Sequence, residues 1–551
     1  MKFLLPCLFL FTLSLSAQET PAFTRQDTLR GSITPQRSWW DLTFYDLHLT
    51  VNPADSSIAG YNVVRYKTLK PGQELQIDLQ PPMVLTRAGQ DEVPLTVRRE
   101  GNAHFIQLKN PAKTGQSGEI RVWFEGKPQV SKRPPWSGGI TWAKDDNGLP
   151  WVVSTCQGDG ASLWWPCKDH AYDEPDSMRM TVTVPEPLRN ISNGRQISES
   201  SADGWHTSVW AVRNPINNYG VNINIGDYVH FGEKYAGEKG ELDCDYYVLR
   251  DHLKMARTHF REVPRMLEAF EYWFGPYPFY EDSFKLVDVP YPGMEHQSSV
   301  TYGNDYKNGY KGKDVSGTGW GFNFDFIIIH ESGHEWFANN ITAVDVADLW
   351  IQEGFTAYSE NLFLDYFYGK KAACEYAIGT RKNILNDRPV IGPYNVNRSG
   401  SHDMYSKGAN LLHTLRMVVD DDELWRQILR GLNRDFYHRT VTSAQVEAYI
   451  AEKSGRQLGP VFDQYLREKN IPELKYYWKN GALHYRWSNC LPTFNMPVRV
   501  SLNGQDTWLQ ASTAWQELAV KDKGRELIPD PNFYVTAQDL DALQSGADVS
   551  R

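Results

Sequence analysis

The segment best suited to catalysis is His330-Glu331-Ser332-Gly333-His334, which lies between apolar residues on both sides. Residues i and i+4 of an α-helix project from one face, so both imidazoles could bind one Zn²⁺ at about 2.0–2.1 Å. Glu331 would border the same cavity, where a carboxylate can take a proton from water. The spacing therefore predicts a metal-assisted hydrolysis site, with His330 and His334 as ligands and Glu331 as general base.

A third metal ligand is expected on a second helix. Glu353 follows His334 after eighteen intervening residues, within an otherwise apolar helical pattern. An acidic residue on such a face is costly unless it is paired or bound to a cation, the alternative being a solvated helix charge. Two His and one Glu without a nearby Cys are typical of a catalytic zinc with an open position. We therefore predict one Zn²⁺, bound by His330, His334 and Glu353.

Two further segments complete a recognisable set of motifs: Val289-Pro290-Tyr291-Pro292-Gly293-Met294-Glu295-His296 and Tyr405-Ser406-Lys407-Gly408-Ala409. With the H-E-x-x-H pair and its distant Glu, they resemble the zinc aminopeptidases typified by aminopeptidase N, which have G-x-M-E-N and Y-x-K-G motifs. The resemblance spans about residues 37–470. It implies an N-terminal antiparallel β-sandwich, a thermolysin-like, mainly helical catalytic domain and a further β domain, hence a multidomain α+β fold.

The resemblance also assigns roles to individual residues. It implies that Glu295, beside Gly293 and Met294 of the same motif, anchors the free α-amine of a peptide. Tyr405 takes the role of the hydrogen-bond donor to the developing oxyanion, for which a protonated phenol is suited. Gln157 resembles the family's glutamine beside the amine and the first side chain.

The resemblance also implies roles for two further residues. Tyr291 is expected to line the amine pocket, and Glu360 is a candidate acceptor that would orient a metal-bound imidazole. The chain departs from the family pattern at Pro292, which replaces the first Gly of the motif, and at His296, which replaces its Asn. These changes leave the anchoring carboxylate of Glu295 in place but alter its neighbours.

We therefore predict a zinc aminopeptidase that acts on peptides with a free N-terminus. Two alternatives remain within enzymes, an endopeptidase or an epoxide hydrolase built on the same zinc site, and Glu295 argues against the first. A third alternative is an exported ligand-binding protein whose zinc only braces the middle domain.

The elements that must position these residues follow from hydrophobic periodicity. Short alternating runs from Trp39 to about residue 235 predict an antiparallel β domain over 37–238, with Tyr45, Leu47, Leu49 and Val51 on one face. After residue 250 the spacing becomes helical, which predicts helices over 326–338, 349–366 and 405–419 within a catalytic domain over 239–470. Thr442 and Gln445 form a capping-box pattern before another helix.

The C-terminal segment returns to alternation. Asn480-Gly481 lies between two alternating apolar runs, a strong signal for a β-hairpin because both turn residues need a positive φ. A small β domain is therefore expected over 471–546. The Gly-rich stretch over 302–321 is expected to be a long mobile loop.

Composition and the N-terminus limit the location and the partners. The 551 residues carry 57 Lys and Arg against 67 Asp and Glu, a net charge of −10, which lacks the basic excess needed for nucleic acid binding. Residues 1–17 have one cation, a thirteen-residue apolar run and small residues, the pattern of a signal peptide that is too short to span a bilayer. We expect export to a periplasm or the extracellular space, and no transmembrane segment.

Cysteine usage gives no disulfide framework. After removal of the signal, five cysteines remain, scattered along the chain. Cys156 and Cys167 are the closest pair in sequence, and the sequence leaves open whether they form a bridge.

Overall fold

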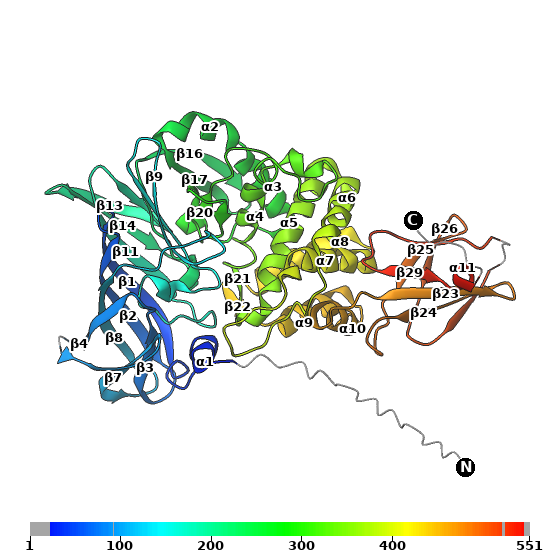
Figure 1. The fold of residues 1–551 in the computed structure, drawn as a ribbon, viewed down its shortest axis with the longest axis horizontal. Helices are drawn as coiled ribbons and strands as arrows, with labels where there is room; N and C mark the ends of the chain where they lie inside the picture. The colour runs from blue at the N-terminus through cyan, green and yellow to red at the C-terminus, as the bar shows by residue number, and fades with distance from the viewer. Residues whose placement is uncertain (1–22, 92, 521–523, 545–551) are drawn as a thin grey trace, which may run out of the picture.

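The chain folds into three consecutive parts in a computed structural model that describes residues 23–91, 93–520 and 524–544. A β-rich part lies at one end, a helical part in the middle and a small β part at the other end (Figure 1). This arrangement confirms the predicted fold class. The predicted signal peptide lies outside the described residues. Among the residues that are described, no helix is long and apolar enough to cross a membrane.

The first part is built on an eight-stranded sheet in the order β13-β14-β11-β1-β2-β8-β4-β5. Tyr45, Leu47, Leu49 and Val51 are all buried, as their alternation predicts. The sheet departs from a purely antiparallel pattern in one place, because β1 and β11 run parallel. A parallel neighbour needs a long connection, and the chain between these two strands is long enough to form most of the other sheets of this part. The strand bounds are β1 Trp40–Asn52, β2 Ser57–Thr68, β4 Val84–Gln90, β5 Val93–Pro94, β8 Ser117–Gly126, β11 Ser177–Pro185, β13 Arg195–Ala202 and β14 Trp205–Val212.

Two smaller sheets pack with this one around a shared core that is rich in tryptophan. One has the order β3-β7-β6 and the other β12-β15-β10-β9. Cys156 and Cys167 both belong to this core as free thiols, so the question left open by the sequence is answered against a bridge. The bounds are α1 Arg25–Gly31, β3 Gly72–Asp78, β6 Thr96–Glu100, β7 Ala103–Ala112, β9 Gly139–Lys144, β10 Pro150–Thr155, β12 Arg189–Ile191 and β15 Asn224–Gly226.

The middle part opens with a mixed five-stranded sheet in the order β16-β17-β18-β20-β19. β16 and β17 form one hairpin that pairs from Tyr228 with Leu249 to Gly237 with Gly240. The sequence predicts a domain boundary between residues 238 and 239, which would divide this hairpin at its turn. The sheet therefore begins earlier in the chain than the predicted catalytic domain does. The bounds are β16 Tyr228–Gly237, β17 Gly240–Leu249, β18 Phe284–Asp288, β19 Gly293–Met294 and β20 Val300–Tyr302.

Helices form the rest of the middle part, beside the short parallel pair β21 and β22. The predicted helices over 349–366 and 405–419 are observed, and Thr442 caps α9 in a capping box with Gln445. The bounds are α2 Leu253–His259, α3 Glu262–Phe274, α4 Phe326–Gly333, β21 Ile341–Ala343, α5 Trp350–Tyr368, α6 Lys370–Thr380, α7 Ser406–Val419, α8 Asp422–Asp435, β22 Arg439–Val441, α9 Ser443–Ser454 and α10 Gly459–Phe462.

The helix predicted over 326–338 is wrong at its end, because α4 stops at Gly333 and His334 is its C-cap. The apolar residues beyond it serve another purpose. The chain turns so that the Trp336 ring packs edge-on against Phe270 and its Nε1 donates to the Gly275 carbonyl at 2.9 Å. Apolar spacing alone therefore overestimates the length of this helix.

The last part contains a four-stranded sheet in the order β27-β24-β23-β29 and a three-stranded sheet in the order β26-β25-β28. Asn480 and Gly481 join β23 to β24 with φ of 54° and 79°, which confirms the predicted hairpin turn. The bounds are β23 Glu473–Lys479, β24 Ala482–Ser488, β25 Val498–Leu502, β26 Gln505–Leu509, β27 Gln516–Ala519, β28 Leu527–Pro529, β29 Thr536–Asp539 and α11 Leu540–Gln544.

A buried ion pair in the first part gives a test of its packing. The Lys168 side chain is fully buried, donates to Asp173 and to the Trp40 carbonyl, and lies 3.8 Å from the Trp40 ring. We expect Asp173→Asn to lower the free energy of unfolding by about 3–5 kcal/mol, because it leaves the Lys168 charge buried without its carboxylate.

Urea denaturation of the single variant and of the double variant with Lys168→Met measures this effect. The double variant should recover part of the loss, since it no longer buries a charge. Equal stability of Asp173→Asn and the wild-type protein would contradict this account of the pair.

Candidate metal centre and active site

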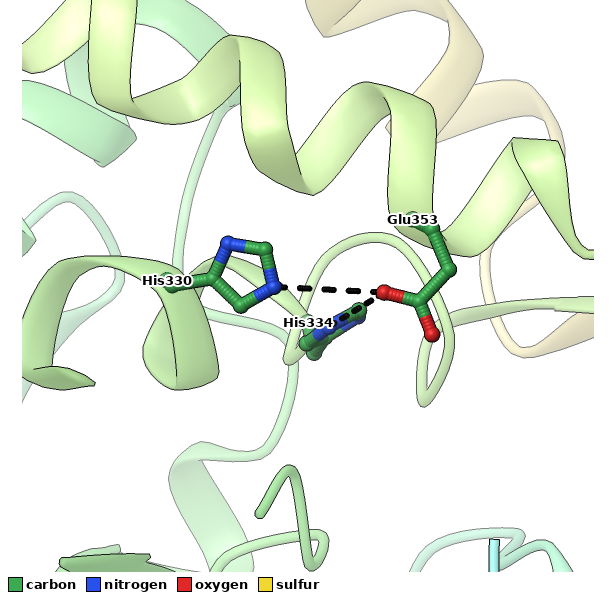
Figure 2. Close-up of side chains that lie close together, drawn as sticks. All are labelled: His330, His334 and Glu353. Atoms are coloured by element: carbon green, nitrogen blue, oxygen red, sulfur yellow. Dashed lines mark ion pairs between the residues drawn. The ribbon is translucent and has the colours of Figure 1, made fainter. Parts of the chain in front are cut away.

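Helices α4 and α5 bring the three predicted metal ligands together. His330 and His334 project from the end of α4 toward Glu353 on α5 (Figure 2). Glu353 Oε2 lies 3.9 Å from His330 Nε2 and 3.4 Å from His334 Nε2. All three side chains are buried, and one ligand atom from each lies within 4.8 Å of the others.

The N-terminus of α4 is fixed by a buried carboxylate. Asp325 is the N-cap and accepts hydrogen bonds from the backbone N–H groups of Ile327 and Ile328. The same carboxylate is contacted by His259 Nε2 at 2.6 Å and by the Tyr302 hydroxyl at 2.8 Å. These contacts set the start of the helix, and therefore the direction of the two imidazoles one turn later.

Close helix packing brings a further motif to the site. A Cβ atom added at Gly408 of α7 would lie 2.9 Å from the Gly354 Cα of α5, so side chains at these two positions would separate the helices. Tyr405 stands at the start of α7, three residues before Gly408. Gly408 therefore lets Tyr405 approach Glu353, the residue directly before Gly354.

The far nitrogens of both imidazoles have partners that orient the rings. His330 Nδ1 lies 2.8 Å from Glu360 Oε1, and the Tyr376 hydroxyl donates to the other oxygen of that carboxylate at 2.6 Å. His334 Nδ1 lies 3.0 Å from the Phe337 carbonyl. With Nδ1 as the donor, the neutral form of each ring has its free Nε2 directed toward Glu353, where a metal ion can bind it.

Sequence reasoning identified Glu360 as a candidate for this position but missed the partners of His334. One is a backbone carbonyl, which leaves no signal in a sequence. The other is Thr356, whose hydroxyl lies 3.0 Å from His334 Nδ1. Thr356 lies one helical turn after Glu353, and this spacing is the only sequence pattern that could have indicated its contact with His334.

The donor set fits Zn²⁺. Tetrahedral coordination at about 2.0–2.1 Å places two ligand atoms roughly 3.3 Å apart, close to the 3.4 Å and 3.9 Å separations around Glu353 Oε2. Two imidazole nitrogens and one carboxylate oxygen, with no thiolate, are typical of a catalytic zinc that keeps one position for water or substrate.

Negative charge is concentrated around this donor set. Glu295, Glu331 and His334 form a second close group, with ligand atoms within 4.8 Å of one another. Burial raises the pKa of Glu331 to about 7, and the nearby Glu295 charge adds to the effect. Burial alone would lower the pKa of His334, but Glu353 and Glu295 outweigh it and raise this pKa to about 10. Carboxylates in such proximity favour a bound cation.

A cavity of about 440 Å³ opens onto these groups. The residues that the sequence singled out for the site line it, apart from Tyr291 and from Glu360, which lies behind His330. The Tyr291 hydroxyl instead lies 3.3 Å from the Ser154 carbonyl and 3.1 Å from Thr301 Oγ1, within the core of the first part. The prediction that Tyr291 lines the pocket is therefore not met. The lining residues from the sequence-based set are Gln157, Gly293, Met294, Glu295, His330, Glu331, His334, Glu353 and Tyr405.

Glu295 carries an unusual oxygen atom. Its side chain is 2% exposed, and Oε1 has no hydrogen-bond partner among the described residues. A buried carboxylate oxygen without a donor is costly, so it indicates a site for a cationic group of a ligand. Asn339 holds the residue in place by donating to the Glu295 carbonyl at 2.9 Å.

Gln157 reaches the site by a different contact from the expected one. Its Nε2 donates to Glu353 Oε1 at 2.7 Å, so it binds the carboxylate of a predicted metal ligand. This hydrogen bond leaves Glu353 Oε2 directed at the two imidazoles.

Tyr405 lies beside the metal ligands. Its ring centre is 6.0 Å from that of His330, with the two planes 23° apart. Burial, together with the carboxylates of Glu353, Glu295 and Glu331, holds the pKa of this phenol well above its usual value. Tyr405 therefore remains a hydrogen-bond donor at neutral pH.

Steric crowding explains the glycine at position 293, in the motif that contains Glu295. A Cβ atom at Gly293 would lie 2.5 Å from the Ile327 side chain and 3.1 Å from Glu331 Cγ, because β19 packs directly on α4. His296, which replaces the family's Asn, is fully buried, with Nδ1 3.2 Å from Thr301 Oγ1. It faces the sheet and does not line the cavity.

Sequence reasoning missed part of the cavity wall. Phe326 stacks on the His330 ring at 5.2 Å, and Tyr310 packs edge-on against Phe326. Tyr310 belongs to the Gly-rich stretch over 302–321, for which the sequence predicts a long mobile loop and no part in the site. Asn304 ties this stretch to the start of α4 by donating to Asp325 Oδ1 at 2.9 Å.

Comparison with known proteins agrees with this geometry. Residues 42–219 match the peptidase M1 N-terminal domain, and residues 259–465 match the peptidase family M1 domain. A leucyl aminopeptidase of Saccharolobus solfataricus is 22% identical over 376 residues, which cover 65% of this chain and 46% of that protein. Endoplasmic reticulum aminopeptidase 1 of Mus musculus is 26% identical over 296 residues, which cover 51% of this chain and 31% of that protein. The chain thus spans less than half the length of these curated relatives.

Among solved structures, an M1 zinc metallopeptidase from Deinococcus radiodurans superposes with a TM-score of 0.68 at 21% identity. The match covers 79% of this chain and 95% of that one, which shows that the fold is shared. The two family matches together cover more than half of the 551 residues, with the N-terminal domain before the catalytic one. The chain therefore belongs to the peptidase M1 family.

Proposed function

We propose that this protein is an exported zinc-dependent aminopeptidase that removes the N-terminal residue of peptides. The observation that carries the proposal is the buried Oε1 of Glu295, which lacks a hydrogen-bond partner in the described part of the chain and lies beside the His330, His334 and Glu353 donor set. A free α-amine is a cation that this oxygen can bind, and it places the first peptide bond next to the metal site. The relatives named as aminopeptidases support the same activity.

In this proposal His330, His334 and Glu353 hold the zinc ion. When bound, zinc supplies a Lewis acid that lowers the pKa of water and polarises the scissile carbonyl. Glu360 and the Phe337 carbonyl keep the two imidazoles in the tautomer that a metal requires. Gln157 orients Glu353 through the 2.7 Å hydrogen bond.

Glu331 acts as the general base. Its pKa of about 7, raised by burial, suits a group that accepts a proton from the attacking water and delivers it to the leaving amine. Tyr405 donates a hydrogen bond to the oxyanion that develops on the carbonyl.

Glu295 determines that the enzyme removes single residues from the N-terminus. An internal peptide bond would leave its carboxylate buried without a cation, which penalises endopeptidase cleavage. This argument also favours peptide hydrolysis over epoxide hydrolysis and over a purely structural zinc. Export through the signal at residues 1–17 belongs to the proposal and rests on the sequence pattern alone.

The first test concerns the general base. We expect Glu331→Gln to lower kcat for an aminoacyl-arylamide by about 10²–10⁴-fold, because the amide cannot accept the proton. Zinc content, measured by atomic absorption, should stay at one ion per chain, since Glu331 is not a proposed ligand. Wild-type turnover that survives complete removal of zinc by a chelator would contradict a zinc-dependent mechanism.

The second test concerns the amine anchor. Wild-type protein should cleave a panel of aminoacyl-arylamides and should not cleave the same compounds with an N-acetyl block. We expect Glu295→Gln to lower kcat/KM for the unblocked compounds by about 10²-fold or more, because a buried charge pair is lost. Efficient wild-type cleavage of the blocked compounds, or of an internally quenched peptide with a blocked N-terminus, would refute the assignment.

The third test concerns the residues that orient the ligands. We expect Glu360→Gln to weaken zinc binding by about 10–100-fold, because the carboxylate that aligns His330 is lost. Competition with a fluorescent chelator measures the affinity. Glu452→Gln, which removes an exposed carboxylate remote from the site, is the matched control and should bind zinc as the wild-type protein does. Identical affinities of both variants would argue against this role of Glu360.

A further inference from the structure

Apart from its imidazoles, the charged side chains that line the cavity are acidic. Its wall contains three carboxylates, those of Glu295, Glu331 and Glu353, and no Lys or Arg among the described residues. A short peptide, however, carries a negative carboxylate at the end opposite its amine. The cavity itself therefore offers no cation to that end of a substrate, and the surrounding residues must be considered.

A tight turn at the cavity mouth supplies a cation. Residues 133–137 follow β8, and the turn closes where Ser137 N donates to the Arg133 carbonyl at 3.0 Å and Arg133 N donates to Ser137 Oγ at 2.7 Å. Thr155 Oγ1, at the end of β10, donates to the carbonyls of Pro135 and Ser137. The turn is thus attached to the strand that leads directly to Gln157.

This turn presents an aromatic ring and a cation together. Pro135 and Trp136 line the cavity, and the Trp136 side chain is 56% exposed, which is unusual for so large an apolar group. The Arg133 guanidinium lies over that ring, 5.0 Å from its centre. Stacking on tryptophan holds a guanidinium in one orientation and leaves its N–H donors free for a planar anion.

Arg133 has no carboxylate partner within ion-pair distance in the described part of the chain. Its charge nevertheless reaches the cavity wall. Burial and the Glu331 carboxylate raise the pKa of Tyr310, and Arg133 acts in the opposite direction on the same phenol. Tyr310, which lines the cavity, is therefore within electrostatic reach of both Glu331 and Arg133.

We propose that Arg133, held on Trp136, binds the C-terminal carboxylate of short peptides whose amine is bound by Glu295. This inference rests on the proposed aminopeptidase function and specifies its substrate class. A cavity of about 440 Å³ is in the size range of pockets for small ligands, which fits peptides of a few residues. Substrates with a negative end are favoured because the two ends of the peptide then face opposite charges.

The test compares peptides that differ only at their C-terminus. Di-, tri- and tetrapeptides with the same N-terminal residue are assayed as free acids and as C-terminal amides. We expect wild-type protein to show a kcat/KM about fivefold higher for the acid than for the amide at the length that spans the cavity, mostly through KM. The ratio should decrease as ionic strength rises, because an exposed ion pair is screened.

Variants then assign this preference to Arg133. Arg133→Ala should bring the acid-to-amide ratio to about one, whereas Arg133→Lys should retain part of it. Lys132→Ala removes the neighbouring exposed cation and should keep the wild-type ratio. Circular dichroism and zinc content check that each variant is folded.

Two outcomes would overturn the inference: a wild-type ratio of one at every length, or an equal loss for acid and amide in Arg133→Ala. Both are separable from a failure of the proposed function. If that function is wrong, the wild-type protein does not cleave an unblocked aminoacyl-arylamide, a compound that has no C-terminal carboxylate.

Discussion

The site depends on one buried convergence, in which a carboxylate from α5 meets two imidazoles from α4. Neither helix could bury these groups alone, because an isolated buried carboxylate and a pair of imidazoles are each costly without a partner. Of their separations, 3.4 Å is close to the distance between two ligand atoms of a shared zinc ion, and 3.9 Å is somewhat longer. The contacts that set the position of each helix, such as the Asp325 cap and the Gly354 to Gly408 approach, support this meeting point.

Glycine has the same purpose in two motifs of this chain. Gly293 lets β19 lie directly on α4, and Gly408 lets α7 lie directly on α5. In both cases a polar residue a few positions away, Glu295 or Tyr405, is thereby brought to the cavity. The motif residues that carry chemistry and those that permit close packing are different, and both are needed for the geometry.

The cavity lies at the seam between the β-rich first part and the helical part. Gln157 comes from the first part and binds Glu353 of the helical part. Met294 belongs to β19 in the sheet of the helical part, yet it packs into the core of the first part. Relative motion of the two parts would therefore alter the contacts of Glu353. The charge distribution follows the same seam, with carboxylates at the inner end and Arg133 on the turn from the first part.

The sequence by itself determined which residues can take part in catalysis and which helices and strands carry them. The i, i+4 spacing of His330 and His334, the alternation in β1 and the Asn480-Gly481 turn are local patterns that backbone geometry translates directly into structure. It overestimated the length of α4, because side-chain packing overrides periodicity. Tyr291, which the family resemblance placed at the amine pocket, lies in the core of the first part. The tertiary structure alone decided that Gln157 binds Glu353, that Phe337 orients His334, and that Trp136 and Tyr310 reach the cavity. Those contacts join residues far apart in the chain or use backbone atoms, which no local pattern encodes.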